Sequence, residues 1–289
     1  MQIALWIGLA AVAFVLLLIL FLLWQNHGLV TTRYMVQSQK LPAAFDGFRI
    51  VQVSDLHNKW FGRGQKRLLR RIAREKPEII VVTGDLISRR RLRLPPAMAF
   101  IDRAVKLAPV YFVPGNHEPW CGAYPEIRER LLDAGVHLLE DEAIWLTRDG
   151  AAGPESNESI RLLGARDPGF YADRHIDEAA VDRVEAVLER LSVPEAYQIL
   201  LSHRPELIER YAKIGVDLAF SGHAHGGQVR LPLIGGLYAP SQGVLPKYTS
   251  GVNCLGSTAM VVSRGLGNSL MPIRVFNRPE VVTVTLRKA

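Results

Sequence analysis

Five apolar runs that each lead into Asp, His or Asn constrain the fold of this chain more than any other sequence feature. The runs have the length and composition of buried β-strands, and they cover residues 48–53, 78–83, 110–113, 197–201 and 217–220. Helical patterns lie between several of them, and alternating strands and helices predict an α/β fold. In such folds ligands bind beyond the carboxyl ends of the strands. Five polar strand ends that point the same way would therefore form one site.

Sequence patterns also predict the remaining elements. Helices are expected at residues 64–76, 96–107 and 177–191. Further strands are expected at residues 31–36, 161–165, 259–263, 273–276 and 281–286, and a surface loop at residues 149–157. The chain has 289 residues, of which 48% are hydrophobic, so it can bury a full core.

The first 24 residues do not belong to that core. The run from Ile3 to Trp24 carries no charged or strongly polar side chain, and its 22 residues would span about 33 Å as a helix, enough to cross a bilayer. A cleaved signal peptide is the main alternative, but its apolar region is usually about 7–15 residues long and follows a basic start. Here the run is longer and no Lys or Arg precedes it. We therefore predict an uncleaved transmembrane helix over residues 1–24.

The remaining residues divide into a connector, residues 25–47, and one large domain, residues 48–289. Basic residues follow the predicted span, starting with Arg33 and Lys40, whereas none precedes it. The positive-inside rule then places the large domain in the cytoplasm. Cys121 and Cys254 are the only cysteines and lie far apart in the sequence, so no disulfide framework is required. This cysteine usage is consistent with a reducing compartment.

The net charge of +7 comes from one part of the chain. Residues 63–93 hold eleven Lys or Arg and three acidic residues, so the remainder is close to neutral. The basic residues lie on the predicted helix at 64–76 and in the segment from Arg89 to Arg93. One interpretation is a solvated helix face followed by a basic loop. The other is a surface that lies on anionic lipid, which a nearby membrane helix favours.

The polar residues that follow the five strands share one kind of chemistry. They are Asp55, His57, Asp85, Asn116, His117, His203, His223 and His225. A lone buried histidine is more often a hydrogen-bonded core residue than a ligand, but carboxylate, imidazole and amide groups together hold zinc, manganese or iron. With one histidine kept for catalysis, seven ligands exceed a single tetrahedral site, and paired metals form the usual clamp for displacement at phosphorus. The sequence therefore predicts two divalent metal ions and does not choose among these metals.

Five spaced motifs occur in this order: Asp55-x-His57, Gly84-Asp85, Gly115-Asn116-His117-Glu118, His203 and Gly222-His223-x-His225. With this full set the chain strongly resembles the calcineurin-like metallophosphoesterases, over about residues 48–289. The resemblance implies a four-layer αββα sandwich, here with an N-terminal transmembrane helix. The stretches Ser202–Pro205, His225–Gln228 and Ser263–Gly267 are similar to a membrane-associated bacterial subgroup of the family. Related members of that subgroup include hydrolases of UDP-diacylglucosamine, a lipid A precursor.

The resemblance also implies a role for each motif residue. It divides the ligands between two metal ions: one is held by Asp55, His57 and His225, the other by Asn116, His203 and His223, and Asp85 bridges them. Water activated by the metals would attack phosphorus. His117 would be the catalytic residue beside the leaving oxygen, as proton donor or charge stabiliser, oriented by a carboxylate such as Glu118. An equal alternative for Glu118 is a carboxylate at the start of a helix. Arg204 and Arg230 are candidates to bind substrate phosphate, and surface or structural roles are the alternative for both.

These expectations combine into a membrane-anchored, metal-dependent phosphoesterase. Its substrate would be a phosphodiester or pyrophosphate in a membrane lipid or lipid precursor such as UDP-diacylglucosamine. The protein would be a single-pass protein of the bacterial inner membrane, in contact with anionic lipid, and the sequence indicates no specific protein partner. One alternative is a phosphodiesterase for soluble nucleotides or nucleic acid, which the basic cluster also suits. Another is a non-catalytic membrane scaffold stabilised by its metals.

Overall fold

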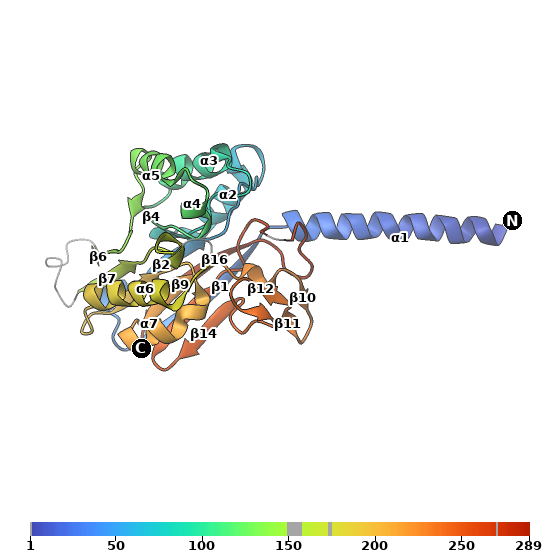
Figure 1. Cartoon of the computed structure of the whole chain (residues 1–289). Coiled ribbons are helices and arrows are strands. Elements are labelled where there is room, and N and C mark those ends of the chain that lie inside the picture. The colour runs from blue at the N-terminus through green and yellow to red at the C-terminus, as the bar shows by residue number, and fades with distance from the viewer. Residues whose placement is uncertain (1, 149–157, 173–174, 270) are drawn as a thin grey trace.

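The computed structural model describes residues 2–148, 158–172, 175–269 and 271–289, so the loop predicted at 149–157 lies outside the described residues (Figure 1). Two six-stranded sheets form the centre. In the first sheet the strands lie in the order β1 (Val30–Ser38), β16 (Glu280–Lys288), β2 (Arg49–Val53), β3 (Ile79–Thr83), β4 (Val110–Val113) and β5 (His137–Leu138). All neighbours pair in parallel except β16 with β2.

The second sheet has a parallel centre and antiparallel edges. Its strands lie in the order β14 (Gly251–Leu255), β15 (Thr258–Val262), β9 (Leu218–Ser221), β8 (Gln198–Leu201), β7 (Ser159–Gly164) and β6 (Glu142–Thr147). The strands β15, β9, β8 and β7 pair in parallel, whereas β14 and β6 pair antiparallel with their neighbours. The five strands predicted to lead into the site are thus β2, β3 and β4 of one sheet and β8 and β9 of the other.

Helices cover the outer face of each sheet. The first sheet packs against α2 (Lys66–Glu75), α3 (Leu94–Ala104) and α5 (Tyr124–Asp133), and the second against α6 (Glu178–Leu191) and α7 (Ile208–Ile214). Figure 1 shows the two helical layers above and below the sheets. The predicted four-layer αββα sandwich is confirmed.

The strand β3 shows why the central runs are apolar throughout. Ile79 and Val81 belong to the core between the two sheets, whereas Ile80 and Val82 belong to the core between the first sheet and its helices. A strand with helices on one side and a second sheet on the other has no solvent face, so both sets of alternate side chains must be apolar.

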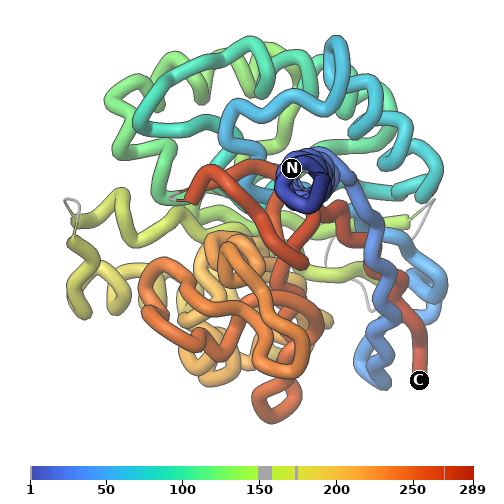
Figure 2. Tube along the Cα trace, turned by 90° about the vertical axis from the view of Figure 1, so that its right-hand side faces the viewer, coloured from blue at the N-terminus to red at the C-terminus, as the bar shows by residue number. Residues whose placement is uncertain are grey.

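The helix α1 (Gln2–His27) projects from the body, as Figures 1 and 2 show. It is long and apolar enough to cross a membrane, and its apolar window is not buried against the rest of the described chain. Its C-terminal end contacts the body. The side chain of Asn268 donates a hydrogen bond to the Asn26 side chain (3.0 Å), and the Arg278 guanidinium lies 4.5 Å from the Trp24 ring centroid.

The predicted connector at residues 25–47 is folded into the body. The strand β1 pairs with β16 along its whole length, from Val30 with Glu280 to Ser38 with Lys288. Leu41 and Phe45, which follow β1, are fully buried between the sheets. This segment therefore joins α1 to the edge of the first sheet without a free linker.

The segment that precedes β16 corrects one expectation. Residues 273–276 were predicted to be a strand, but they form a loop that makes only one isolated bridge, from Val275 to Val229. Two short hairpins lie close by: β10 (Arg230–Leu231) with β11 (Gly235–Gly236), and β12 (Tyr238–Ala239) with β13 (Gly243–Val244). In Figure 1 these hairpins lie on the side of the body from which α1 projects.

Candidate metal centre

The polar ends of five strands meet at one edge of the sandwich. The strands β2, β3 and β4 lead into the residues Asp55, His57, Asp85, Asn116 and His117, and β8 and β9 lead into His203, His223 and His225. Within each sheet these strands are parallel, so their carboxyl ends lie at the same edge. All eight side chains are buried or nearly so, and the donor atoms among them form two groups.

The first group consists of Asp55, His57, Asp85 and His225. Nε2 of His57 lies 3.1 Å from Nε2 of His225, which lies 3.3 Å from Oδ1 of Asp55. Oδ2 of Asp85 lies 3.5 Å from Nε2 of His57. Ligand bonds of about 2.0–2.1 Å in a tetrahedron separate the ligand atoms by about 3.3 Å. The spacing therefore fits one divalent metal ion.

The second group consists of Asp85, His203 and His223. Nε2 of His203 lies 3.3 Å from Oδ2 of Asp85 and 3.2 Å from Nδ1 of His223. The same Asp85 oxygen thus faces both groups, which is the position of a ligand that bridges two ions. His223 and His225 fall into different groups although only one residue separates them.

Asn116 supplies an independent test of this fit. Among the described residues, its Oδ1 atom is buried and has no hydrogen-bond partner. A buried polar atom without a partner costs about 1–3 kcal/mol, so such an atom is expected where a ligand completes the structure. Asn116 lines the same cavity as Asp85 and His223. The residues present therefore fit two divalent metal ions.

The protonation states also suit cations. Burial lowers the pKa of His57 to about 3 and holds the pKa values of His223 and His225 well below the ordinary value. These rings are neutral near pH 7 and keep a lone pair for a cation. Burial would lower the pKa of His203 too, but the Asp85 carboxylate outweighs it and raises this pKa to about 10. A divalent cation would compensate the same carboxylate charge.

The backbone of the centre is held in an unusual conformation. Positive φ angles, which non-glycine residues rarely adopt, occur at Asp55, His57, Asp85, His223 and His225. Hydrogen bonds between the strand-end loops hold these residues in place, for example from Asp55 N to Gly84 O (3.0 Å) and from His57 N to Asp85 O (3.1 Å). Strained residues of this kind cluster at functional sites, where the surrounding structure enforces them.

Gly222 shows how closely the loops approach one another. A Cβ atom at this position would lie 1.9 Å from Oγ of Ser54 and 2.5 Å from Oδ2 of Asp55. The Ser54 hydroxyl donates a 2.6 Å hydrogen bond to that Asp55 oxygen and so orients the carboxylate. Glycine is therefore required where the loop after β9 crosses the loop after β2.

His117 starts the short helix α4 (His117–Trp120) and belongs to neither donor group. The backbone N–H of Arg89 donates to its Nδ1 atom (3.1 Å), which leaves the proton of the neutral ring on Nε2. That Nε2 atom lies 4.0 Å from Oδ2 of Asp85 and faces the centre. Burial is the main cause that lowers the pKa of His117, so the ring is neutral near pH 7.

The expectation that a carboxylate orients the His117 ring was wrong. The hydrogen bond that orients it comes from the Arg89 backbone. Glu118 is fully buried and accepts hydrogen bonds from the backbone N–H groups of Asp85 (2.9 Å) and Gly115 (2.8 Å). Burial, with the nearby charge of Asp85, raises the pKa of Glu118 to about 8. Glu118 therefore ties together the two loops that carry Asp85 and Asn116.

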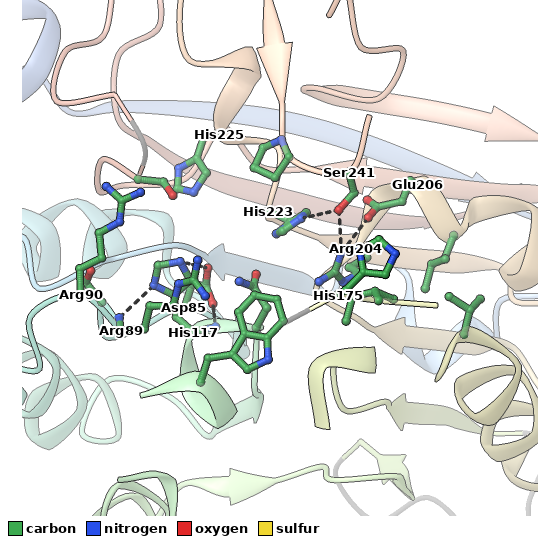
Figure 3. Close-up of a pocket in the computed structure, with 18 residues that line it drawn as sticks. Asp85, Arg89, Arg90, His117, His175, Arg204, Glu206, His223, His225 and Ser241 are labelled. Carbon is green, nitrogen blue, oxygen red and sulfur yellow. Dashed lines mark hydrogen bonds and ion pairs between the residues drawn. The ribbon is translucent and has the colours of Figure 1, made fainter. Parts of the chain in front are cut away.

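A cavity of about 500 Å³ opens onto the centre (Figure 3). Besides the predicted site residues, its lining includes Arg89, Arg90, Trp120, His175 and Ser269. Sequence reasoning missed these residues as parts of the site. A basic segment after a strand end was the only signal that could have placed Arg89 and Arg90 there.

The two arginines predicted to bind substrate lie in different places. Arg204 lines the cavity, but Asp167, Glu206 and Ser241 accept hydrogen bonds from its buried guanidinium. Its charge is therefore largely compensated within the protein. Arg230 does not line this cavity and instead donates to the carbonyl of Gly226 (2.9 Å). The structure does not bring Arg230 to the centre.

Comparison with known proteins identifies the family of the chain. The family model described as calcineurin-like phosphoesterase matches residues 48–227. The metallophosphoesterase YkuE of Bacillus subtilis is 31% identical over 274 residues, which cover 91% of this chain and 87% of the relative. The phosphodiesterase YaeI of Escherichia coli is 30% identical over 215 residues, which cover 73% of this chain and 71% of the relative.

A transmembrane protein with metallophosphoesterase domain from Bos taurus is 28% identical over 263 residues, which cover 89% of this chain and 57% of that relative. The family match covers more than half of this chain and contains every strand-end motif. The chain is therefore a member of the calcineurin-like phosphoesterase family, and it is a metal-dependent phosphoesterase.

Proposed function

We propose that the protein is a membrane-anchored phosphoesterase that hydrolyses a phosphodiester or pyrophosphate bond in a membrane lipid or lipid precursor such as UDP-diacylglucosamine. One observation carries the proposal: the neighbouring residues Asn268 and Ser269 take part in the junction with α1 and in the cavity, respectively. Ser269 lines the cavity, and Asn268 donates to Asn26 in the last turn of α1. Pro272 and Ile273 lie beside the apolar part of α1.

This arrangement suits an amphipathic substrate. The apolar run of α1 ends at Trp24, and Asn268, which contacts the last turn of α1, is followed directly by Ser269 of the cavity wall. A lipid in the same bilayer could place its phosphorus at the metal centre while its acyl chains remain in the membrane. A soluble substrate would gain nothing from this proximity.

The residues of the centre support hydrolysis. Two divalent ions held there would activate water for attack on phosphorus and neutralise charge on the phosphoryl oxygens. His117 presents an Nε2–H toward the centre, so it can donate a proton to the leaving oxygen. Arg90 is exposed at the cavity wall and can attract the negatively charged head group.

We place the protein in a bacterial inner membrane, with the catalytic domain in the cytoplasm and anionic lipid around the base of α1. Basic side chains at that base support this orientation. The guanidinium of Arg67 donates to the carbonyl of His27 (3.1 Å), and that of Arg278 lies over the ring of Trp24.

A phosphodiesterase for soluble nucleotides or nucleic acid is the second candidate, because Arg89 and Arg90 at the cavity wall would also suit those substrates. A non-catalytic scaffold has less support. His117 belongs to neither group of metal donors, and a purely structural metal site does not need a buried histidine that directs an N–H at it.

The test uses full-length protein in detergent, supplied with manganese. Three substrates are compared: UDP-diacylglucosamine, bis-p-nitrophenyl phosphate and a short single-stranded DNA. Asp85→Ala is the control for contaminating hydrolases. Rapid, Asp85-dependent cleavage of the lipid supports the proposal. Cleavage of the generic diester alone contradicts UDP-diacylglucosamine as the substrate, DNA cleavage favours the second candidate, and metal binding without any cleavage favours the scaffold.

A further inference from the structure

The body exposes a group of apolar side chains beside the base of α1, which we call the apolar shelf. It comprises Leu233, Ile234, Val244, Leu245, Ile273 and Phe276, from the two short hairpins and the loop before β16. Leu233 is 108% exposed and Val244 77% exposed. Scattered apolar residues are normal on protein surfaces, but a contiguous exposed group marks an interaction site.

The apolar shelf is continuous with α1. The ring of Phe276 packs on the ring of Phe21, with centroids 5.6 Å apart. Phe276 also shares a surface hollow with Leu233 and Ile234, and Leu245 N donates to Leu237 O (2.9 Å), which joins the second hairpin to the first. In Figure 2, viewed along α1, the hairpins and the loop before β16 face the viewer on the side from which the helix projects.

The position of these contacts along α1 sets the depth of the apolar shelf. Ile273 shares a hollow with Ile19 and Leu23. Ile19 precedes Trp24 by five residues, which corresponds to about 7.5 Å along a helix. The same hollow extends to Asn26 and His27, so with α1 across a bilayer and Trp24 at the interface, Ile273 lies at the boundary between the hydrocarbon and the head groups.

The backbone directs the shelf side chains outward at a cost. Leu233, Leu245 and Phe276 have φ angles of 69°, 52° and 50°, in the left-handed region that such residues rarely adopt. Outside the metal centre, strained residues of this kind call for a functional reason. Contact with lipid would supply that reason here.

The charge of the surrounding sequence favours a bilayer as the occupant. Residues 218–279 contain no Asp or Glu. The same stretch contains four basic residues that reach the surface at least in part, Arg230, Lys247, Arg264 and Arg278, and the buried Arg274. An apolar surface with a basic surround is typical of proteins that lie in the interface of an anionic membrane.

We propose that the apolar shelf inserts into the same leaflet as the base of α1, so that the catalytic body is itself embedded in the membrane surface. This inference rests on the anchoring part of the proposed function. Because Asn268 contacts the last turn of α1 and the adjacent Ser269 lines the cavity, insertion places the cavity mouth at the level of the lipid head groups. The substrate class is then a phosphoester at the membrane interface.

The test places an environment-sensitive fluorophore on single cysteines in the full-length protein, in nanodiscs of phosphatidylethanolamine and phosphatidylglycerol. The background carries Cys121→Ser and Cys254→Ser, and its hydrolysis of bis-p-nitrophenyl phosphate verifies the fold. The labelled sites are Leu233→Cys and Val244→Cys on the apolar shelf and Leu16→Cys within α1. The matched control is Leu132→Cys, an exposed leucine (45%) on α5. Doxyl-labelled lipid serves as the quencher.

We expect doxyl lipid to quench the fluorophores at 16, 233 and 244 at least threefold more strongly than the one at 132. If the fluorophore at 16 is quenched but those at 233 and 244 are quenched no more than the one at 132, the insertion of the shelf is overturned and the anchor stands. Absence of quenching at 16 would overturn the anchor and the insertion together. Hydrolysis of lipid and soluble substrates is measured on the same samples, so failure of the substrate assignment is seen separately.

Discussion

The metal centre and the apolar shelf both lie in loops beyond the sheets, and both contain residues with positive φ angles. In the centre, the side chains of Asp55, His57 and Asp85 are buried, and hydrogen bonds between loops hold them. On the shelf, the side chains of Leu233 and Val244 extend into the surroundings. The protein itself therefore supplies the environment that stabilises the centre, whereas the shelf requires an environment from outside. We infer that the centre performs the chemistry and that the shelf positions the centre at the membrane surface.

The largest expected effect tests the centre as a unit. Asp85→Ala removes the oxygen that faces both donor groups. The rate of hydrolysis of every substrate should fall by roughly 10³-fold or more, because metal stabilisation of the transition state contributes several kcal/mol. Steady-state rates and bound metal measured by atomic emission check this result. Chelation should inactivate the wild-type enzyme, and added manganese should restore it but not the variant. Asp102→Ala on the exposed face of α3 is the matched control.

His117→Asn should separate catalysis from metal binding. Loss of a general acid lowers the rate by about 10²–10⁴-fold, whereas both donor groups remain complete. A proton donor matters most for a poor leaving group, so hydrolysis of an alkyl ester should fall more than that of a p-nitrophenyl ester. Equal losses on both esters, or loss of one metal ion, would contradict the assigned role.

The shelf should affect only substrates in a membrane. In Leu233→Asp/Val244→Asp, kcat/KM for a lipid phosphoester in vesicles should fall by at least about 10- to 100-fold, because burial of even one such side chain contributes about 1.5–3 kcal/mol. Hydrolysis of bis-p-nitrophenyl phosphate should not change, since neither residue lines the cavity. Leu132→Asp controls for the added charge, and a parallel loss on the soluble diester would show damage to the fold instead.

The smallest effect concerns the strained backbone. Leu245→Gly removes the unfavourable left-handed conformation but makes the unfolded chain more flexible, so the free energy of unfolding should change by less than about 1 kcal/mol. Thermal unfolding in detergent measures this change.

By contrast, Gly222→Ala in the centre should weaken metal binding by about 10–100-fold, because the added Cβ would push the side chains of Ser54 and Asp55 away from the loop after β9. Similar small effects at both positions would remove the distinction between the two regions.

The convergence of the site residues could be predicted from the sequence, because it follows from the direction of the strands. Parallel strands place their carboxyl ends together, so motifs after β2, β3, β4, β8 and β9 had to converge. The long-range contacts could not be predicted in this way. Arg89 and His175 reach the cavity from segments far apart in the chain, and Arg230 turns to the Gly226 carbonyl although it follows the last motif closely.

The error at residues 273–276 has a different cause. Three of these four residues, Ile273, Val275 and Phe276, are of the β-branched and aromatic types that favour strands, and such residues usually face the interior of the protein. Here the side chains of Ile273 and Phe276 are exposed beside α1, while the side chain of Arg274 is buried and donates to the backbone carbonyls of Arg264 and Asn277. Residue type alone therefore predicted the wrong structure for this stretch.

The pairing of β1 with β16 has a consequence for where the enzyme can reach. A flexible linker as long as residues 25–47 would let the body move to about 25 Å from the end of α1. Instead, β1 begins three residues after the end of α1 and is hydrogen-bonded along its length to β16, so no flexible linker of that length separates the helix from the body. With α1 in a bilayer, the metal centre would stay at a nearly constant distance from the membrane surface. Encounter with substrate then becomes a search in two dimensions, and phosphorus atoms at any other height are excluded by distance before the shape of the cavity can discriminate among them.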